Sequence, residues 1–186
     1  MSSEAAAAIR VSGSDGPPPL ADMAPEDIVG RYRSARLTYA DGTSRSVLLV
    51  DEEVPFPDGR LLLSSTDVHG RIVLVNRSLV ELSGYAREEL IGAPIQILQH
   101  PSTPAAVLAG LWSRVRAGAQ WRGCVKYLRK DGRYFWAHEI VIANVRNGRT
   151  VAYTSVRRKA SRGEIARCER DRISRAFVVG TGTHVP

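Results

Sequence analysis

The chain has 186 residues, of which 44% are hydrophobic and 24% charged, with a formal net charge of +7 and a pI near 9.9. This length suits one domain with appendages, and no apolar run approaches the roughly 20 residues that a membrane span needs. The basic residues come without a helix-turn-helix or zinc-finger pattern, so a nucleic-acid-binding protein is not indicated. The N-terminus lacks the basic start and the apolar stretch of a signal peptide, which favours a cytoplasmic location.

The sequence does not predict an enzyme. Cys124 and Cys168 match no metal-ligand spacing, and two thiols do not make a disulfide framework. No nucleophile–base pair, phosphate-binding loop or metal cluster can be recognised along the chain.

The N-terminal part has two sections. Residues 1–25 are rich in Ala, Ser, Gly and Pro, a composition typical of a disordered arm. Residues 26–52 form an N-terminal extension, in which two β-like runs around Asp41-Gly42 predict a hairpin.

Short elements follow densely from Leu61. We expect strands over 61–67 and 71–76, a short helix over 77–84 that ends at Gly84, and a single helical turn at 87–90. Thr103 and Pro104 mark the start of a longer helix, with Pro at its first position and an end near Gly118.

The last part of the chain predicts three strands and a helix. The strands are expected over 120–129, 134–145 and 150–158, joined at Asp131-Gly132 and Asn147-Gly148, dipeptides that tolerate the positive φ of tight hairpins. Ser161 and Glu164 form a capping box that opens a charged helix over 162–177, within a tail of residues 161–186. This order predicts an α+β fold: a five-stranded antiparallel sheet with short helices and one long connector helix on one face.

Residues 53–160 resemble a PAS domain, in particular the aerotaxis-receptor type. The resemblance rests on "SSTDVHGRIVLVNRSLVELSGYAREELIG", on His100-Pro101, on "AGLW", and on "WRGCVK", "RKDGRYFWA" and "AYTSVR". It implies a PAS fold and a sensory role in signal transduction. In that family the redox or oxygen state, or cellular energy, is sensed through a bound flavin, FAD.

Strand alternation and the resemblance point to one pocket. On the strand 120–129, Trp121, Gly123 and Tyr127 share an inward face, and the glycine lets a ligand approach the sheet closely. With the positions that the resemblance implies, the expected cofactor-binding residues are Asn76, His100, Trp112, Trp121 and Tyr127. Each also has a structural reading: a helix cap for Asn76, a loop residue for His100, and core packing for the three aromatics.

Three positions depart from the family pattern. The family has Arg and Asp where this chain has Gln99 and Ser102, and Asn where Tyr127 stands. A phenol cannot reproduce the donor and acceptor pattern of a carboxamide. The alternative function is therefore a ligand-free PAS module that mediates protein–protein association. The light-sensing flavin branch needs a reactive Cys on the short helix, where "PIQILQHP" has none.

The strand 134–145 is apolar on both faces. Tyr134, Trp136, Ile140 and Ile142 share the outer face and need a cover, supplied either by the 26–52 extension or by a second subunit. We expect a homodimer.

Two further expectations concern an ion pair and the tail. Glu139 pairs with Arg157 if it faces inward, and otherwise it is exposed. The helix from 162 is expected to leave the core as a connector or a partner-binding arm, since the output of the signal needs a partner protein or domain that this sequence does not contain.

Overall fold

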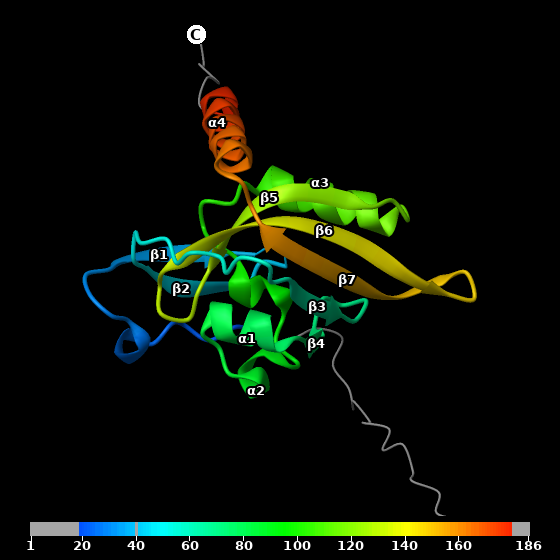
Figure 1. The fold of residues 1–186 in the computed structure, drawn as a ribbon, viewed down its shortest axis with the longest axis horizontal. Helices are drawn as coiled ribbons and strands as arrows, with labels where there is room; N and C mark the ends of the chain where they lie inside the picture. The colour runs from blue at the N-terminus through cyan, green and yellow to red at the C-terminus, as the bar shows by residue number, and fades with distance from the viewer. Residues whose placement is uncertain (1–18, 40, 180–186) are drawn as a thin grey trace, which may run out of the picture.

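The structure is a computed structural model that describes the backbone of residues 19–39 and 41–179, with side chains as far as residue 170. Most of the disordered arm expected over 1–25, up to residue 18, and the end of the tail from residue 180 lie outside the described residues. The predicted fold class is confirmed: a five-stranded antiparallel sheet carries its helices mainly on one face (Figure 1).

The sheet has the strand order β4-β3-β7-β6-β5. Its strands are β3 (Leu62–Thr66), β4 (Ile72–Val75), β5 (Trp121–Leu128), β6 (Tyr134–Arg146) and β7 (Arg149–Lys159). The two predicted hairpins close as expected, with Asn147 at a φ of 51° in the β6–β7 turn. Because β3 pairs with β7, the first and last segments of the sheet meet at its centre.

Four helical segments cover the inner face of the sheet. They are α1 (Arg77–Ser83), α2 (Arg87–Leu90), the 3-10 segment η2 (Ile95–Leu98) and α3 (Ala105–Arg116). Their apolar residues form one cluster with the inner side chains of β5, β6 and β7. Pro104 is the N-cap of α3 and not its first residue, and the Thr103 hydroxyl donates to the carbonyl of Lys126, 3.3 Å away, instead of capping the helix.

The N-terminal extension forms a hairpin at one end of the sheet. After the 3-10 turn η1 (Pro25–Asp27), β1 (Arg33–Thr38) and β2 (Ser44–Leu49) pair antiparallel and pack around Leu128 (Figure 1). The β5–β6 turn fixes this contact, because Val50 N donates to the carbonyl of Gly132 at 2.8 Å. A Cβ on Gly132 would lie 2.8 Å from the carbonyl oxygen of Leu48, so only glycine allows the approach.

The outer face of the sheet is covered differently from the expectation. The apolar cluster of the hairpin reaches Leu128, which pairs with Tyr134, but not Trp136, so the extension does not cover Trp136. Trp136 packs instead with Ala160 and with Ile165 of α4 (Arg162–Val179). Because only two residues separate the end of β7 from the start of α4, the first turns of the helix lie on the sheet before it runs beyond it (Figure 1). The helix is therefore part of the domain at its start and projects only afterwards.

The core contains the expected ion pair. Glu139 and Arg157 stand directly opposite each other on β6 and β7, with Arg157 Nη2 2.7 Å from Glu139 Oε1. Their side chains are only 5% and 1% exposed, so the inward reading of Glu139 is confirmed. A pair this deeply buried loses its hydration, and its stability depends on both partners remaining in place.

We predict that Arg157→Met lowers the free energy of unfolding by about 3–5 kcal/mol, because it leaves the Glu139 carboxylate buried without a counter-charge. The double variant Arg157→Met/Glu139→Leu should recover most of that loss, since neither charge then remains in the core. Urea unfolding followed by circular dichroism measures both. A single variant as stable as the wild type would show that the pair is not buried in solution.

Candidate functional site

Aromatic rings line the inner face of β5, as strand alternation predicts. Trp121 and Tyr127 are both buried, and Tyr127 stacks on Phe135 of β6 with ring centroids 5.2 Å apart. The indole of Trp121 lies directly over Gly123, where a Cβ would be 2.4 Å from the ring. The close approach that this glycine permits is thus made in the structure by Trp121 itself.

Trp112 reaches the same apolar cluster from α3. It is half-buried and meets Tyr153 of β7 edge to face, with ring centroids 5.4 Å apart. Three of the five expected residues, Trp112, Trp121 and Tyr127, therefore belong to one aromatic cluster between α3 and the sheet.

Asn76 has the role of a structural cap. Its Oδ1 accepts from the backbone N–H groups of Leu79, which begins the hydrogen-bonding of α1, and of Leu63 on β3, at 3.0 and 3.1 Å. Its Nδ2 donates to the carbonyl of Leu61 at 2.9 Å. With both ends of the amide bound to backbone, Asn76 joins α1 to β3.

His100 lies beside the edge strand β5, where the preceding residue Gln99 forms a bridge with Tyr127, and it turns away from the aromatic cluster. Its Nδ1 accepts from Ser102 N at 3.1 Å and also meets the Ser102 hydroxyl. Its ring meets Tyr134 edge to face at 5.9 Å. Tyr134 neighbours the inward Phe135 on β6, so the ring of His100 faces the outer side of the sheet.

A polar network crosses the inner face beside the aromatic cluster. Arg157 Nε donates to the hydroxyl of Tyr127 at 2.9 Å, and Nη1 donates to Ser64 Oγ at 3.0 Å, in addition to the ion pair with Glu139. Burial raises the pKa of the Tyr127 hydroxyl well above its usual value, although Arg157 acts in the opposite direction. Tyr127 is therefore neutral at physiological pH.

Two members of this network could not be predicted from the sequence. The pairing of Glu139 with Arg157 follows from the alternation of β6, but nothing in the sequence joins Ser64 or Tyr127 to it. Ser64 stands opposite Ser155 on β7, two residues from Arg157, and only this register places its hydroxyl within reach. The signal that could have found it is the polar "SST" run in an otherwise apolar strand.

The inner face can be compared with what a flavin requires. A flat ring needs an apolar slot, and the space over Gly123 is filled by the indole of Trp121, so a flavin ring would enter there only with Trp121 displaced. The polar edge of a flavin needs both donors and acceptors. With Asn76 engaged elsewhere, the groups facing inward that offer both are Arg157, Glu139 and Tyr127. The inward polar groups therefore suit the edge of a planar ligand of this kind, with an Arg–Glu–Tyr set where the resemblance implies a carboxamide, while its ring requires Trp121 to turn aside.

The described part of the chain offers neither a metal site nor a membrane-spanning helix. No group of three or more His, Cys, Asp or Glu side chains there could hold a metal ion. None of the helices described combines the length and the apolar character that crossing a bilayer requires.

Comparisons with known proteins agree with this architecture. The aerotaxis receptor of Escherichia coli (strain K12) is 35% identical over 121 residues, which are 65% of this chain and 24% of the receptor. The bacterioopsin transcriptional activator of Halobacterium salinarum is 27% identical over 103 residues, 54% of this chain and 15% of that protein. The chain spans less than a quarter of the length of these relatives.

Solved structures share the fold. The dark structure of the blue-light photoreceptor Aureochrome1 LOV has a TM-score of 0.55 at 23% identity, covering 61% of this chain and 86% of that chain. The PAS domain of a Colwellia psychrerythraea protein has a TM-score of 0.50 at 26% identity, covering 54% and 86%.

The family profile described as PAS domain matches residues 57–157, more than half of the chain. The match lies on the five-stranded sheet and the helices of its inner face. The resemblance stated from the sequence is confirmed, and the chain belongs to the PAS domain family.

Proposed function

We propose that this chain is a cytoplasmic sensory module for signal transduction, which receives its input at the inner face of the sheet and transmits it through α4. The similarity to the aerotaxis receptor supports redox, oxygen or energy state as the signal. In both relatives the matching region is a small part of a longer protein, which supports the idea that the signal is passed to a partner protein or to a further domain.

One observation carries this proposal: the inner network and the attachment of α4 occupy neighbouring residues of the same two strands. Glu139 and Arg157 face inward, whereas His138 and Arg158, the preceding and following residues, face outward as an opposed pair. The outward pair holds Glu164 in the first turn of α4. Arg158 Nη2 lies 2.6 Å and His138 Nε2 lies 3.8 Å from its Oε1.

The contact that holds the start of α4, between Arg158 and Glu164, is an ion pair near neutral pH. The hydrogen bond from Arg158 is the main cause that lowers the pKa of Glu164 to about 2, so this carboxylate stays ionised near neutral pH. Because His138 and Arg158 are bonded directly to Glu139 and Arg157, a shift of the backbone at the inner pair also moves the outer pair. The sheet can thus pass a change on its inner face to the helix on its outer face.

A flavin, and FAD in particular, is the ligand we propose for the inner face. Trp121 and Tyr127 would hold its ring system, with Arg157 at the polar edge, and the flavin would supply one- or two-electron redox chemistry. The support is the aromatic lining of the inner face, from Trp121 and Tyr127, together with the similarity to an aerotaxis receptor and to a light-oxygen-voltage domain studied with a flavin analogue.

The absorption spectrum of the purified protein tests the ligand. We expect a yellow preparation with a flavin spectrum, and its loss in Trp121→Ala, which should also destabilise the fold by about 3–5 kcal/mol because a large buried ring is removed. Urea unfolding of the same variant separates the two effects. A colourless wild-type protein that takes up no added FAD would contradict the flavin proposal and leave the association function.

The coupling to α4 is tested independently of any ligand. Cys168 Sγ lies 3.1 Å from the carbonyl of Cys124 on β5, and the thiol contact together with burial raises the pKa of Cys124. Release of α4 should therefore speed alkylation of Cys124 by iodoacetamide. We expect Glu139→Gln to raise that rate by about fivefold or more, the lower end of ordinary coupling free energies.

Two controls keep this experiment specific. Glu88→Gln makes the same chemical change at an exposed position of α2 and should label at the wild-type rate. Leu79→Ala lowers stability from α1, away from the pair, and shows how much labelling global unfolding alone produces. Coupling would be refuted if Glu139→Gln labelled no faster than a Leu79 variant of equal stability.

Association through the outer face is the second candidate function. Ile140, Val156 and Leu63 form a half-buried row across β6, β7 and β3. Beside it Ile142 and Leu74 are 41% and 48% exposed. This apolar surface lies beyond the part that α4 covers, and it supports the homodimer expected from the sequence.

Light scattering on Ile142→Glu tests the dimer. The wild type should be dimeric, and the variant should fall to a monomer because the interface would have to bury an unpaired carboxylate. Val29→Glu places the same charge on an exposed residue of the N-terminal extension and should leave the dimer intact. Wild-type protein that stays monomeric at high concentration rules the dimer out.

A further inference from the structure

A charged side chain is buried in the apolar face of the N-terminal hairpin. On β2 the residues Arg45, Val47 and Leu49 share the face that packs on the core, with Leu37 of β1 opposite Arg45 and Tyr39 directly after β1. Arg45 is only 3% exposed. A guanidinium loses its hydration when it is buried among apolar side chains, so the burial of Arg45 needs a specific explanation.

Arg45 has little to compensate its charge. Its closest hydrogen-bonding contact joins Nη2 to the hydroxyl of Tyr85 at 3.5 Å, and its Nε has no hydrogen-bond partner. Among the residues that the structure describes, no carboxylate forms an ion pair with it. Burial raises the pKa of nearby Tyr39 to about 12, so this phenol cannot serve as the counter-anion. An uncompensated buried charge costs several kcal/mol.

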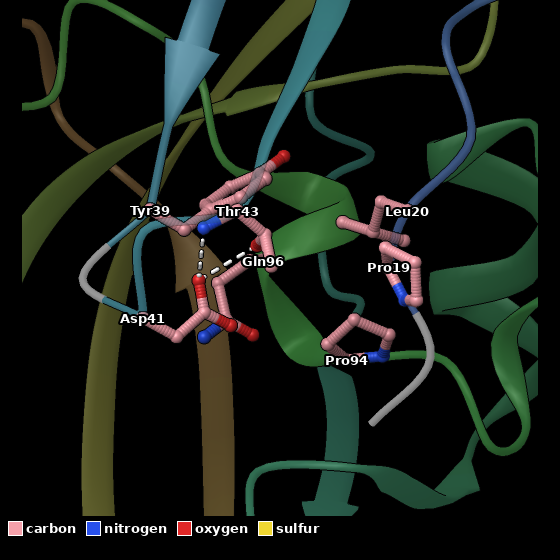
Figure 2. Close-up of a pocket in the computed structure, with 7 residues that line it drawn as sticks. All are labelled: Pro19, Leu20, Tyr39, Asp41, Thr43, Pro94 and Gln96. Atoms are coloured by element: carbon pink, nitrogen blue, oxygen red, sulfur yellow. Dashed lines mark hydrogen bonds between the residues drawn. The ribbon is translucent and has the colours of Figure 1, made fainter. Parts of the chain in front are cut away.

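Two more unpaired polar atoms lie at the same interface. The hydroxyl of Tyr39 and Oε1 of Gln96 are buried, and neither has a hydrogen-bond partner in the described part of the chain. Both residues line a hollow between the hairpin and the η2 segment. Figure 2 shows Tyr39 reaching it from the hairpin side, Gln96 from the helical side, and Leu20 across from them.

A second hollow adjoins the first, because Leu20 lines both. Arg45 and Tyr85 lie in its wall, and much of the remaining lining is apolar, from Leu20, Ala21, Met23, Ala24 and Ile97. A hollow that combines a buried, underused guanidinium with apolar walls is the usual form of a site for a small organic ligand.

We propose that the hollow around Arg45 binds a small monocarboxylate with an apolar body. The planar guanidinium matches the two oxygens of a carboxylate, and the Tyr85 hydroxyl lies beside it as a further donor. The apolar walls suit a short hydrocarbon chain. Bound there, the ligand joins β2 to the loop after α1 and so fixes the hairpin on the PAS core.

The acidic side chains at the mouth of the hollow affect which anions can bind there. Glu89 and Asp27 are paired with Lys130, at 2.8 and 3.7 Å, and Asp22 accepts from Ser46 N at 2.5 Å. These carboxylates are already engaged with groups other than Arg45. Their negative charge at the mouth of the hollow repels a multiply charged phosphate or polycarboxylate more strongly than a singly charged carboxylate.

The site is separate from the inner face of the sheet, and it does not depend on the proposed flavin. It would make the hairpin a second input to the domain.

The test is a calorimetric titration of the full chain with sodium butyrate, with sodium phosphate and sodium citrate at equal ionic strength for comparison. We expect saturable binding of butyrate and none of the two polyanions. Arg45→Met should abolish butyrate binding while the melting temperature stays equal or rises, because a buried unpaired charge has been removed. Arg45→Lys keeps the charge without the planar fork and should weaken binding at least tenfold.

Arg36→Met is the matched control, since Arg36 lies on the same hairpin and is exposed. It should bind butyrate as the wild type does. The proposal is overturned by any of three results: butyrate that fails to bind the wild type at tens of millimolar, equal binding by Arg45→Met, or an Arg45→Met variant that is much less stable, which would make Arg45 a structural residue. Binding of phosphate in place of butyrate would overturn the monocarboxylate class.

Discussion

The ion pair between Arg157 and Glu139 fixes the centre of the sheet. Both side chains are buried, and the guanidinium also donates to Tyr127 and to Ser64, so four strands converge on one charged group. In the low dielectric of a core, each of these groups depends on the others being in place. The register of β3, β5, β6 and β7 must therefore be correct together, since a slip of one residue would turn one of these side chains outward.

A second centre, at the β5–β6 turn, joins the appendages to this sheet. Burial acts to raise the pKa of Asp131, but hydrogen bonds from Arg129 and Arg133 outweigh it and lower the pKa to about 2. The turn holds α1 through the bond from Lys130 N to Ser83 O, and it holds the hairpin through Gly132. The basic residues clustered in this stretch are thus used in building a junction within the molecule.

Each of the three residues that depart from the family pattern makes a specific contact in the structure. Ser102 supplies the N–H and the hydroxyl that meet His100 Nδ1, and the backbone of Gln99 forms a bridge with Tyr127 at the edge of β5. Tyr127 replaces a carboxamide and brings a hydroxyl to Arg157. In the structure His100 meets Ser102 and Tyr134, and the inner face carries Tyr127 with the Arg157–Glu139 pair. A ligand at the inner face would meet different groups from those that the resemblance implies.

The sequence alone determined the elements whose causes are local. The Asp-Gly and Asn-Gly turns, Gly84 with a φ of 77°, and the capping box in which Ser161 and Glu164 exchange hydrogen bonds all appear where neighbouring residues specify them. Alternation along β5 and β6 placed Trp121, Tyr127 and Glu139 on one face, because a strand has a period of two.

The tertiary structure decided what depends on distant partners. The side to which His100 turns, the cover of Trp136 by α4, and the burial of Arg45 against Tyr85 each rest on residues far apart in the chain. The hairpin was predicted from its turn, but its place beside Leu128 was not, because an apolar strand face specifies that it must be covered and not what covers it. Hydrophobic burial has no direction, so only the packing of the whole chain selects the partner.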